Sequence, residues 1–215
     1  MLTVWGRANA FNVQKVMWAV GELGVAHERI DVGGAFGGLD DPAFLSRNPN
    51  GTIPVLNDGA VTVWESHAIV RYLAARYGAG GLWPEEPGAR SGADLWMDWM
   101  QTTLQPDFMR LFWGYVRRPP EARDWPRLRA VLRRYGKLLG LLDRHLAAQP
   151  YLAGESFTMA DIPVGTSLYR TVEMGLEGLV LPDHVAAWHE RLSARGAYQD
   201  HVMIPFDEMW GREGY

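Results

Sequence analysis

The nine residues NPNGTIPVL, Asn48 to Leu56, place a proline at the entry to a short apolar strand. Pro54 lacks the backbone N–H that a central strand donates to its neighbour, so proline in sheets is confined to edge strands, strand starts and bulges. Two interpretations are open: Pro54 begins an edge strand, or the Ile53–Pro54 bond is cis. A cis bond in a tight entry to the strand would turn the N–H and C=O of Ile53 outward, where they could pair with an extended peptide.

The segments around this stretch predict one small α/β unit. Apolar runs, alternation and helical spacing predict, in order, a strand at 2–5, a helix over 13–23 that ends at Gly24, a strand at 27–32, strands at 53–56 and 61–64, and a helix over 66–77. The first strand-helix-strand order implies a right-handed crossover and a parallel pair. The turn Asn57-Asp58-Gly59 between the last two strands predicts a hairpin.

The remainder of the chain predicts helices only. A stretch rich in Gly and Pro, GAGGLWPEEPGA (Gly78 to Ala89), predicts a linker, and helical patterns follow over 90–116, 126–148, 158–174 and 184–195. We therefore expect an α/β domain at 1–79, a linker at 80–89 and an all-helical domain at 90–215.

One helix start is marked by a capping box, Thr158-Met159-Ala160-Asp161. In this motif the threonine hydroxyl accepts a hydrogen bond from the backbone N–H of Asp161, and the carboxylate reaches back to the N–H of the cap residue. We expect a structural role for the box, at the start of a helix in the centre of the second domain.

The composition narrows the classes of function. The chain has 215 residues and a net charge of −4, with Lys and Arg scattered along it, which argues against nucleic acid or a membrane surface as the main partner. It has no run of 18 apolar residues and no leader pattern after Met1, so we expect a soluble, cytoplasmic protein. The absence of cysteine excludes disulfides, cysteine nucleophiles and zinc–thiolate sites, and the six histidines lack metal-ligand spacing. No metal is expected, and any sulfur chemistry must use a thiol that a ligand brings.

A second stretch, VWESHAIVRYL (Val63 to Leu73), places Glu65 and Ser66 at the turn into a helix. Free N–H groups and the helix dipole favour an anion at such a turn. Glu65 would take an ammonium group while Ser66 holds a carboxylate, a combination that suits an α-amino acid. An ordinary helix cap is the alternative.

Taken together at this spacing, these stretches resemble the cytosolic glutathione transferase family. NPNGTIPVL and VWESHAIVRYL match its glutathione-site motifs, the Gly/Pro stretch matches its domain junction, and GESFTMADI (Gly154 to Ile162) matches the capping motif of its helical domain. The resemblance covers nearly the whole chain. It implies a thioredoxin-like α/β N-terminal domain, an all-α C-terminal domain and a homodimer. It also implies glutathione as one substrate and a small hydrophobic electrophile as the other.

The resemblance implies a role for each matching residue. Ile53 would pair through its backbone with the cysteinyl part of glutathione, and Glu65 and Ser66 would hold its γ-glutamyl end. Thr52 stands where a longer polar side chain often reaches the glycyl end, so Asn50 or the Gly-rich segment GGAFGGLDDP would supply that contact.

The first helix after the linker carries WMDWMQTTLQPDF, which resembles the corresponding helix of bacterial members. Asp98 falls where some members reach across the dimer to the γ-glutamyl amine, and a solvated carboxylate is the alternative. Gln105, seven residues on, would face the second-substrate pocket. Phe11, Met109 and Trp113 offer apolar surface for that pocket.

The segment after the first strand departs from the family's pattern. Many members activate the thiol with Ser or Tyr there, in the most similar branch as Ser-x-Asn-x-x-Lys-Val, but here the serine position is Ala10. Asn12 would donate its amide N–H to the thiolate instead, as in some bacterial members, and Arg7 would add positive charge. The alternatives are that Asn9 is a simple N-cap and Arg7 a solvated surface side chain.

The loss of the serine is compatible with activity. Lowering a thiol pKa of about 8.5 by roughly two units needs about 2.7 kcal/mol. A hydrogen bond to a charged acceptor contributes about 1.5–3 kcal/mol, and a helix N-terminus roughly 0.3–1 kcal/mol. We expect an enzyme that activates the thiol of glutathione for attack on a small electrophile. Two alternatives stay open: a glutathione-dependent disulfide reductase or peroxidase, and a non-catalytic binding module of the same fold.

Overall fold

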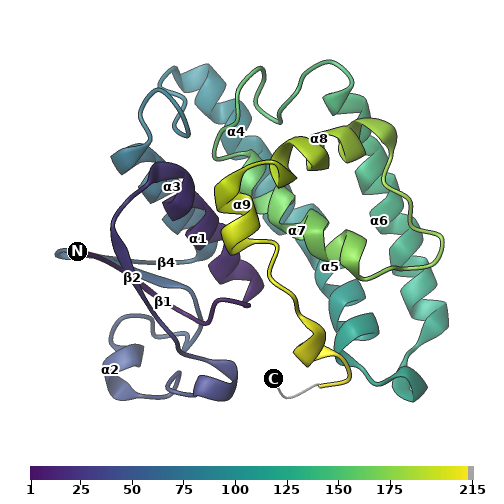
Figure 1. Ribbon diagram of the computed structural model, residues 1–215, viewed down its shortest axis with the longest axis horizontal. Coiled ribbons are helices and arrows are strands. Elements are labelled where there is room, and N and C mark those ends of the chain that lie inside the picture. The colour runs from purple at the N-terminus through teal and green to yellow at the C-terminus, as the bar shows by residue number, and fades with distance from the viewer. Residues whose placement is uncertain (213–215) are drawn as a thin grey trace.

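A four-stranded sheet forms the N-terminal part of the computed structural model, which describes residues 1–212 (Figure 1). The strands, in the spatial order β2-β1-β3-β4, are β1 (Leu2–Trp5), β2 (His27–Ile30), β3 (Val55–Asp58) and β4 (Val61–Trp64). β1 and β2 are parallel, and β3 is antiparallel to both β1 and β4. The helices of this part are α1 (Phe11–Leu23), α2 (Pro42–Leu45) and α3 (Ser66–Tyr77). This is the thioredoxin-like arrangement that the sequence predicts.

The hairpin between β3 and β4 turns later than predicted. Asn57 and Asp58 belong to β3, and Asp58 pairs with Val61, so only Gly59 and Ala60 lie between the strands. Gly59 has a φ of 60°, a conformation that glycine adopts without steric cost. The glycine therefore makes the turn, and the two polar residues before it extend the strand.

Pro54 precedes β3, and its peptide bond with Ile53 is cis. The alternative of an edge strand is wrong, because β3 lies between β1 and β4. Asn48, which is 1% exposed, holds the loop before the proline. Its Nδ2 donates to the carbonyl of Thr52 at 2.8 Å, and its Oδ1 accepts from the backbone N–H of Asn50 at 3.1 Å. The loop is thus fixed against the entry to β3.

Helix α1 is buried along most of its length and packs against α3 and the C-terminal helices. It starts at Phe11, two residues earlier than predicted, and Gly24 ends it in the left-handed conformation, with a φ of 61°. Its N-cap is Ala10, which has no capping side chain, so the expectation that Asn9 caps this helix is wrong. The Asn9 amide instead donates to the carboxylate of Glu208 in the C-terminal segment.

The second part of the chain is helical, as predicted. Its helices are α4 (Pro87–Trp99), α5 (Gln105–Leu111), α6 (Trp125–Leu146), α7 (Asp161–Glu173), α8 (Asp183–Ser193) and α9 (Gly196–His201). Short 3-10 turns lie at Gly34–Phe36, Pro120–Ala122 and Asp207–Met209. The domain limits 1–79, 80–89 and 90–215 stay a prediction.

The first long helix of this part is not the uninterrupted α-helix predicted over 90–116. It begins at Pro87 and contains two π-helical segments, Met100–Leu104 and Phe112–Arg117. Pro106 accounts for the first, because proline has no N–H to donate one turn back and its ring crowds the carbonyl there. Single-turn π segments are frequent at functional sites.

The capping box before α7 forms in part. The N–H of Thr158 donates to Asp161 Oδ2 at 2.9 Å, as predicted. The Thr158 hydroxyl, however, accepts from the N–H of Ala160 at 3.3 Å, while the N–H of Asp161 donates to the Thr158 carbonyl. Asp161 Oδ1 also accepts from the N–H of Leu152 and from Trp188 Nε1, at 2.9 and 3.2 Å. The buried carboxylate therefore joins the start of α7 to α8 and to the loop before the box.

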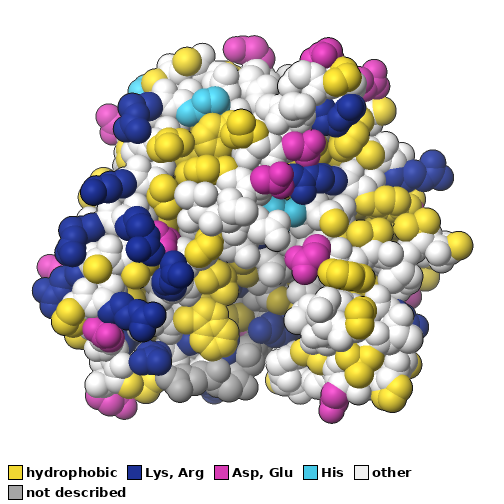
Figure 2. Space-filling model, turned by 180° about the vertical axis from the view of Figure 1, so that it is seen from behind, with side chains coloured by type: hydrophobic (Ala, Val, Ile, Leu, Met, Phe, Trp, Pro, Cys, Tyr) yellow, Lys and Arg dark blue, Asp and Glu magenta, His cyan; other side chains and the backbone are white. Residues whose placement is uncertain are grey.

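The sheet and the helical part form two lobes, and the segment after α9 runs between them (Figure 1). Seen from behind, a recess separates the lobes near the bottom of the view, and basic side chains gather over the lobe that holds α5 and α6 (Figure 2). None of the helices within residues 1–212 is long and apolar enough to cross a membrane.

Candidate active site

A cavity of about 270 Å³ lies between the two lobes. Both parts of the chain contribute to it, from the turn after β1 and the entry to β3 on one side and from α5 and the π segment after it on the other. Its lining includes six of the residues predicted for the site: Arg7, Phe11, Asn12, Ile53, Met109 and Trp113. Residues that are far apart in the sequence thus share one cavity.

Ile53 presents unpaired backbone groups at this cavity. Neither its N–H nor its C=O forms a hydrogen bond with another residue in the described part of the chain. β3 begins only at Val55, after the cis bond to Pro54, so the ladder of the sheet does not include Ile53. Buried backbone groups of proteins are nearly always paired, so this position suits an extended peptide that offers its own N–H and C=O.

Glu65 and Ser66 lie at the N-terminus of α3. Glu65 is the N-cap but its side chain makes no capping hydrogen bond, which does not fit the alternative of an ordinary cap. Its φ of 71° makes it the one non-glycine residue with a positive φ among residues 1–212. Such a conformation costs of order 1–3 kcal/mol and persists mainly at functional sites. Ser66 is 5% exposed and stands with the first free N–H groups of α3, which favour a carboxylate.

A fully buried lysine lies behind Asn12. Lys15 Nζ donates to Asn12 Oδ1 at 3.0 Å and to Gln105 Oε1 at 2.6 Å, and it lies 3.1 Å from His67 Nε2. Burial lowers the pKa of Lys15 to about 7, and the nearby carboxylate of Glu65 acts in the opposite direction. The side chain of Asn12 is therefore attached to a network that joins α1, α3 and α5.

His67 takes part in this network as a neutral ring. Burial lowers the pKa of His67 to about 2, and the positive charges of Lys15 and Arg71 act in the same direction. The neutral ring accepts from Lys15 at Nε2, so its proton is on Nδ1. Within residues 1–212, no group of three or more His, Cys, Asp or Glu side chains is placed to hold a metal ion.

Three arginines, Arg7, Arg117 and Arg170, give the cavity a positively charged lining. Arg170 comes from α7 and is 2% exposed; its Nη2 donates to the carbonyl of Asn9 at 2.6 Å and to Gln14 Oε1 at 3.1 Å. Burial lowers the pKa of Arg170 to about 9, and the charges of Arg7 and Arg117 act in the same direction. The guanidinium stays protonated at neutral pH. Arg7 faces the cavity rather than bulk solvent, which does not fit the alternative of a surface side chain.

Several residues predicted for the site do not line this cavity. Gln105 was expected to face the second substrate, but its side-chain oxygen accepts from the buried ammonium behind Asn12. Asp98 is exposed and forms an ion pair with Arg71 of α3. Thr52 and Asn50 belong to the ordered loop at the entry to β3, near Ile53 but outside the lining.

Four residues of this region were missed in the sequence: Lys15, His67, Arg117 and Arg170. Lys15 and His67 lie next to motifs that were recognised, but only the packing of three helices shows that their side chains meet. Arg170 could have been identified from the sequence. It lies in a helix that was predicted to be central, so its charge must be buried, and a buried charge requires a partner or a functional role.

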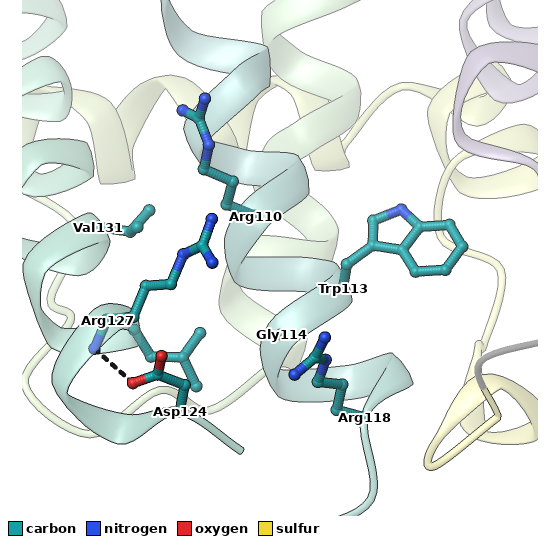
Figure 3. A pocket seen from close by; sticks show the side chains of 8 residues that line it. Arg110, Trp113, Gly114, Arg118, Asp124, Arg127 and Val131 are labelled. Atoms are coloured by element: carbon teal, nitrogen blue, oxygen red, sulfur yellow. Dashed lines mark hydrogen bonds between the residues drawn. The ribbon is translucent and has the colours of Figure 1, made fainter. Parts of the chain in front are cut away.

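A larger cavity, of about 470 Å³, lies inside the helical part between the α5 region and α6. Arg110, Arg118 and Arg127 surround it, while the indole of Trp113 is turned to the opposite side (Figure 3). No residue of the sheet part lines it, whereas Ile53 lines the cavity between the lobes; Glu65 and Ser66 line neither of the two. The cavity between the lobes is therefore the better candidate for a peptide-like ligand.

Both parts of the chain match known families. Residues 1–75 match the glutathione S-transferase N-terminal domain, and residues 126–191 match the glutathione S-transferase C-terminal domain. The chain is 40% identical over 207 residues to glutathione S-transferase GstB of Escherichia coli (strain K12), a match that covers 95% of this chain and 99% of that protein. It is 32% identical over 210 residues to glutathione S-transferase 3 of Zea mays, covering 94% and 93% of the two chains.

A solved structure supports the same assignment. The chain is similar to the theta class glutathione S-transferase of the citrus canker pathogen Xanthomonas axonopodis pv. citri with glutathione bound, with a TM-score of 0.90 and 50% identity over 95% of this chain and 98% of that one. The apo form of that protein gives a TM-score of 0.83. From its sequence and its fold, the chain belongs to the glutathione S-transferase family.

Proposed function

We propose that the protein is a glutathione S-transferase of the Ser/Asn-type pattern in which Asn12, with the serine position occupied by Ala10, activates the thiol of bound glutathione. The observation that carries this proposal is one cavity onto which both the Asn12 side chain and the unpaired backbone of Ile53 open. With its cysteinyl backbone paired to Ile53, glutathione would bring its sulfur to the start of α1. The glutathione bound in the Xanthomonas relative supports this choice of ligand.

The chemistry requires a thiolate near neutral pH. Asn12 Nδ2–H would donate a hydrogen bond to the sulfur, worth about 1.5–3 kcal/mol for a charged acceptor. The N-terminus of α1 and the guanidinium of Arg7 would favour the same negative charge. The thiol loses its proton to water, the thiolate attacks an electrophilic carbon to form an S–C bond, and the leaving group departs with the electrons of the bond that breaks.

The remaining groups of glutathione would find partners around this point. Glu65 would take the γ-glutamyl ammonium, and Ser66 with the free N–H groups of α3 would take the carboxylate. Thr52 and Asn50, in the loop at the entry to β3, would face the glycyl end. Asp98 would reach the γ-glutamyl amine of a second copy of the chain, and we expect a homodimer, which light scattering would show as twice the chain mass.

Titration of the bound thiol tests the role of Asn12. The thiolate of bound glutathione absorbs in the ultraviolet, so its pKa can be followed in the protein, in Asn12→Ala and in Asn12→Asp, which keeps the shape of the side chain but removes the donor. We expect a thiol pKa below about 7.5 in the protein and a rise of at least about one unit in both variants. A bound thiol with its solution pKa, or one that neither variant changes, would refute the proposal and leave the non-catalytic binding module.

The same thiolate could attack sulfur or oxygen instead of carbon. Phe11, Met109 and Trp113 provide an apolar wall that suits a small hydrophobic electrophile. A panel of an aryl halide, a mixed disulfide of glutathione and a hydroperoxide would separate transferase from disulfide reductase or peroxidase. We expect the highest kcat/KM, relative to the uncatalysed reaction, for the aryl halide.

A further inference from the structure

We propose that Lys15 is a positioning residue for this reaction: its side-chain nitrogen holds the oxygen of the Asn12 amide, so that the amide nitrogen of Asn12 faces the sulfur of bound glutathione. The inference rests on the proposed role of Asn12 and adds the reason why that side chain presents a donor. Lys15 does not line the cavity and is 0% exposed, so it acts through Asn12 rather than by contact with substrate.

The surroundings of Lys15 are complementary to an ammonium group. An ammonium has three N–H donors and no acceptor. Three neutral acceptors lie at hydrogen-bond distance: Asn12 Oδ1 at 3.0 Å, Gln105 Oε1 at 2.6 Å and His67 Nε2 at 3.1 Å. Lys15 Nζ also lies over the Phe11 ring, 4.4 Å from its centroid. Each donor therefore has one partner, and the group is fixed in place.

This arrangement determines which end of the Asn12 amide points outward. Because an ammonium can only donate, the carbonyl oxygen of Asn12 must be the end that faces Lys15. The amide nitrogen is then directed away from Lys15, and it forms no hydrogen bond with another residue in the described part of the chain. If the Asn12 amide were flipped by 180°, its oxygen would face the sulfur and would repel a thiolate.

Charge acts in the same sense as geometry. Lys15 forms no ion pair among residues 1–212; the carboxylate of Glu65 is the acidic group that acts on it, and the guanidinium of Arg170 lies 5.9 Å from the centroid of the Phe11 ring. A buried charge is poorly screened, so a thiolate bound near Asn12 and the ammonium of Lys15 stabilise each other. The pKa of Lys15 near 7 is consistent with protonation that strengthens when glutathione binds.

A double-mutant cycle on the bound thiol tests the inference. The thiol pKa of bound glutathione would be measured by thiolate absorbance in the protein, in Lys15→Met, in Asn12→Ala and in the double variant. We expect Lys15→Met to raise the thiol pKa by about one unit, and we expect a clearly smaller rise when Lys15→Met is added to Asn12→Ala, because only the effect of the charge then remains. KM for glutathione should change less than kcat. The chain has one other lysine, Lys137, exposed on α6, so Lys137→Met is a matched control that should leave the thiol pKa unchanged.

The outcomes separate the inference from the proposed function. If Asn12→Ala raises the thiol pKa and Lys15→Met does not, the role of Lys15 is refuted while that of Asn12 stands. If Lys15→Met raises the thiol pKa equally with and without Asn12, Lys15 acts as a distant charge and the positioning role is refuted. If Asn12→Ala has no effect, the proposed function fails first. Lys15→Gln keeps a polar donor, so the pKa of the bound thiol in this variant should lie between the values in the protein and in Lys15→Met. Lys15→Gln replaces Lys15→Met if that variant does not fold.

Discussion

Ala10 is both the N-cap of α1 and the residue at which members with the same sequence pattern carry serine. Its φ of −81° and ψ of 125° are those of a cap residue, but it has no side-chain oxygen to accept from the first N–H groups of the helix. It also lines the cavity beside Asn12. A hydroxyl at this position could therefore affect both stability and the thiol.

We predict that Ala10→Ser stabilises the protein and lowers the pKa of bound glutathione. The serine oxygen would accept from the N–H groups of α1, which is worth about 1 kcal/mol in the free energy of unfolding. Its proton remains available to the sulfur. Urea denaturation measures the first effect and thiolate absorbance the second. Unchanged values of both would show that the serine position no longer has the geometry of a cap or of the site.

Lys15 should titrate near neutral pH in the folded protein. The chain contains only two lysines, so selective isotope labelling gives two side-chain signals in NMR spectra, and Lys137 is the internal reference. Burial lowers the folded-state pKa of Lys15 to about 7 from 10.5. The unfolded state then binds more protons between these two values, so stability rises with pH across this interval.

We expect the free energy of unfolding of the protein, minus that of Lys15→Met, to increase by roughly 2–4 kcal/mol from pH 7 to pH 10.5. A flat difference, or a Lys15 signal that does not titrate near pH 7, would contradict this.

At the residue scale, the sequence indicates groups that stand in loops and at helix ends better than groups that meet in the interior. The roles of Asn12, Ile53 and Glu65 can be predicted from motifs, because each role depends on the position of the residue at a loop or a helix end. Lys15 and Gln105 do not, because their contact depends on how α1 and α5 pack. The spacing predicted that Gln105 faces the second-substrate pocket, but its side-chain oxygen accepts from the buried ammonium of Lys15.

At the scale of elements, most helices and strands start and end within three residues of the sequence prediction. The exceptions have local causes. The four-residue α2 and the six-residue α9 were not predicted, because they are too short to show a hydrophobic period. The π segments before and after α5 depend on Pro106 and on contacts with neighbouring helices rather than on any repeat of apolar residues.

The start of α7 offers a test of one element. Asp161 accepts three hydrogen bonds, two at Oδ1 and one at Oδ2. Asp161→Asn can keep the two at Oδ1, but its amide would oppose the N–H of Thr158. We expect a loss of about 1–3 kcal/mol in the free energy of unfolding for Asp161→Asn and a larger loss, about 3–5 kcal/mol, for Asp161→Ala, which leaves three donors unpaired. Urea denaturation measures both. Equal losses would mean that the hydrogen bonds at Oδ1 contribute little.

At the scale of the whole molecule, the order of a thioredoxin-like part and a helical part is predictable from motifs, whereas the cavity between them is not. Its walls come from segments separated by up to 202 residues, from Arg7 to Met209. The turn after β1 also meets the C-terminal segment, because the Asn9 amide donates to the carboxylate of Glu208. No pattern in the sequence gives the distance between the two lobes. The charge of the cavity is hidden for the same reason.

We predict that this charge makes the enzyme prefer anionic electrophiles. The chain as a whole carries a net charge of −4, yet Arg7, Arg117 and Arg170 all line the cavity. In a recess of low dielectric, such a group of cations attracts anions more strongly than the same charges would on an open surface. A matched pair of substrates, 1-chloro-2,6-dinitrobenzene and 4-chloro-3,5-dinitrobenzoate, differs in one carboxylate. Each kcat/KM is divided by the rate constant of the uncatalysed reaction of that substrate with glutathione. At low salt we expect this normalised kcat/KM to be several-fold higher for the benzoate than for the neutral substrate. This advantage should shrink in about 0.5 M salt, where the screening length falls to a few ångströms. A preference for the neutral substrate at both salt concentrations would show that the arginines are neutralised by their partners within the protein and that the cavity selects by apolar contact alone.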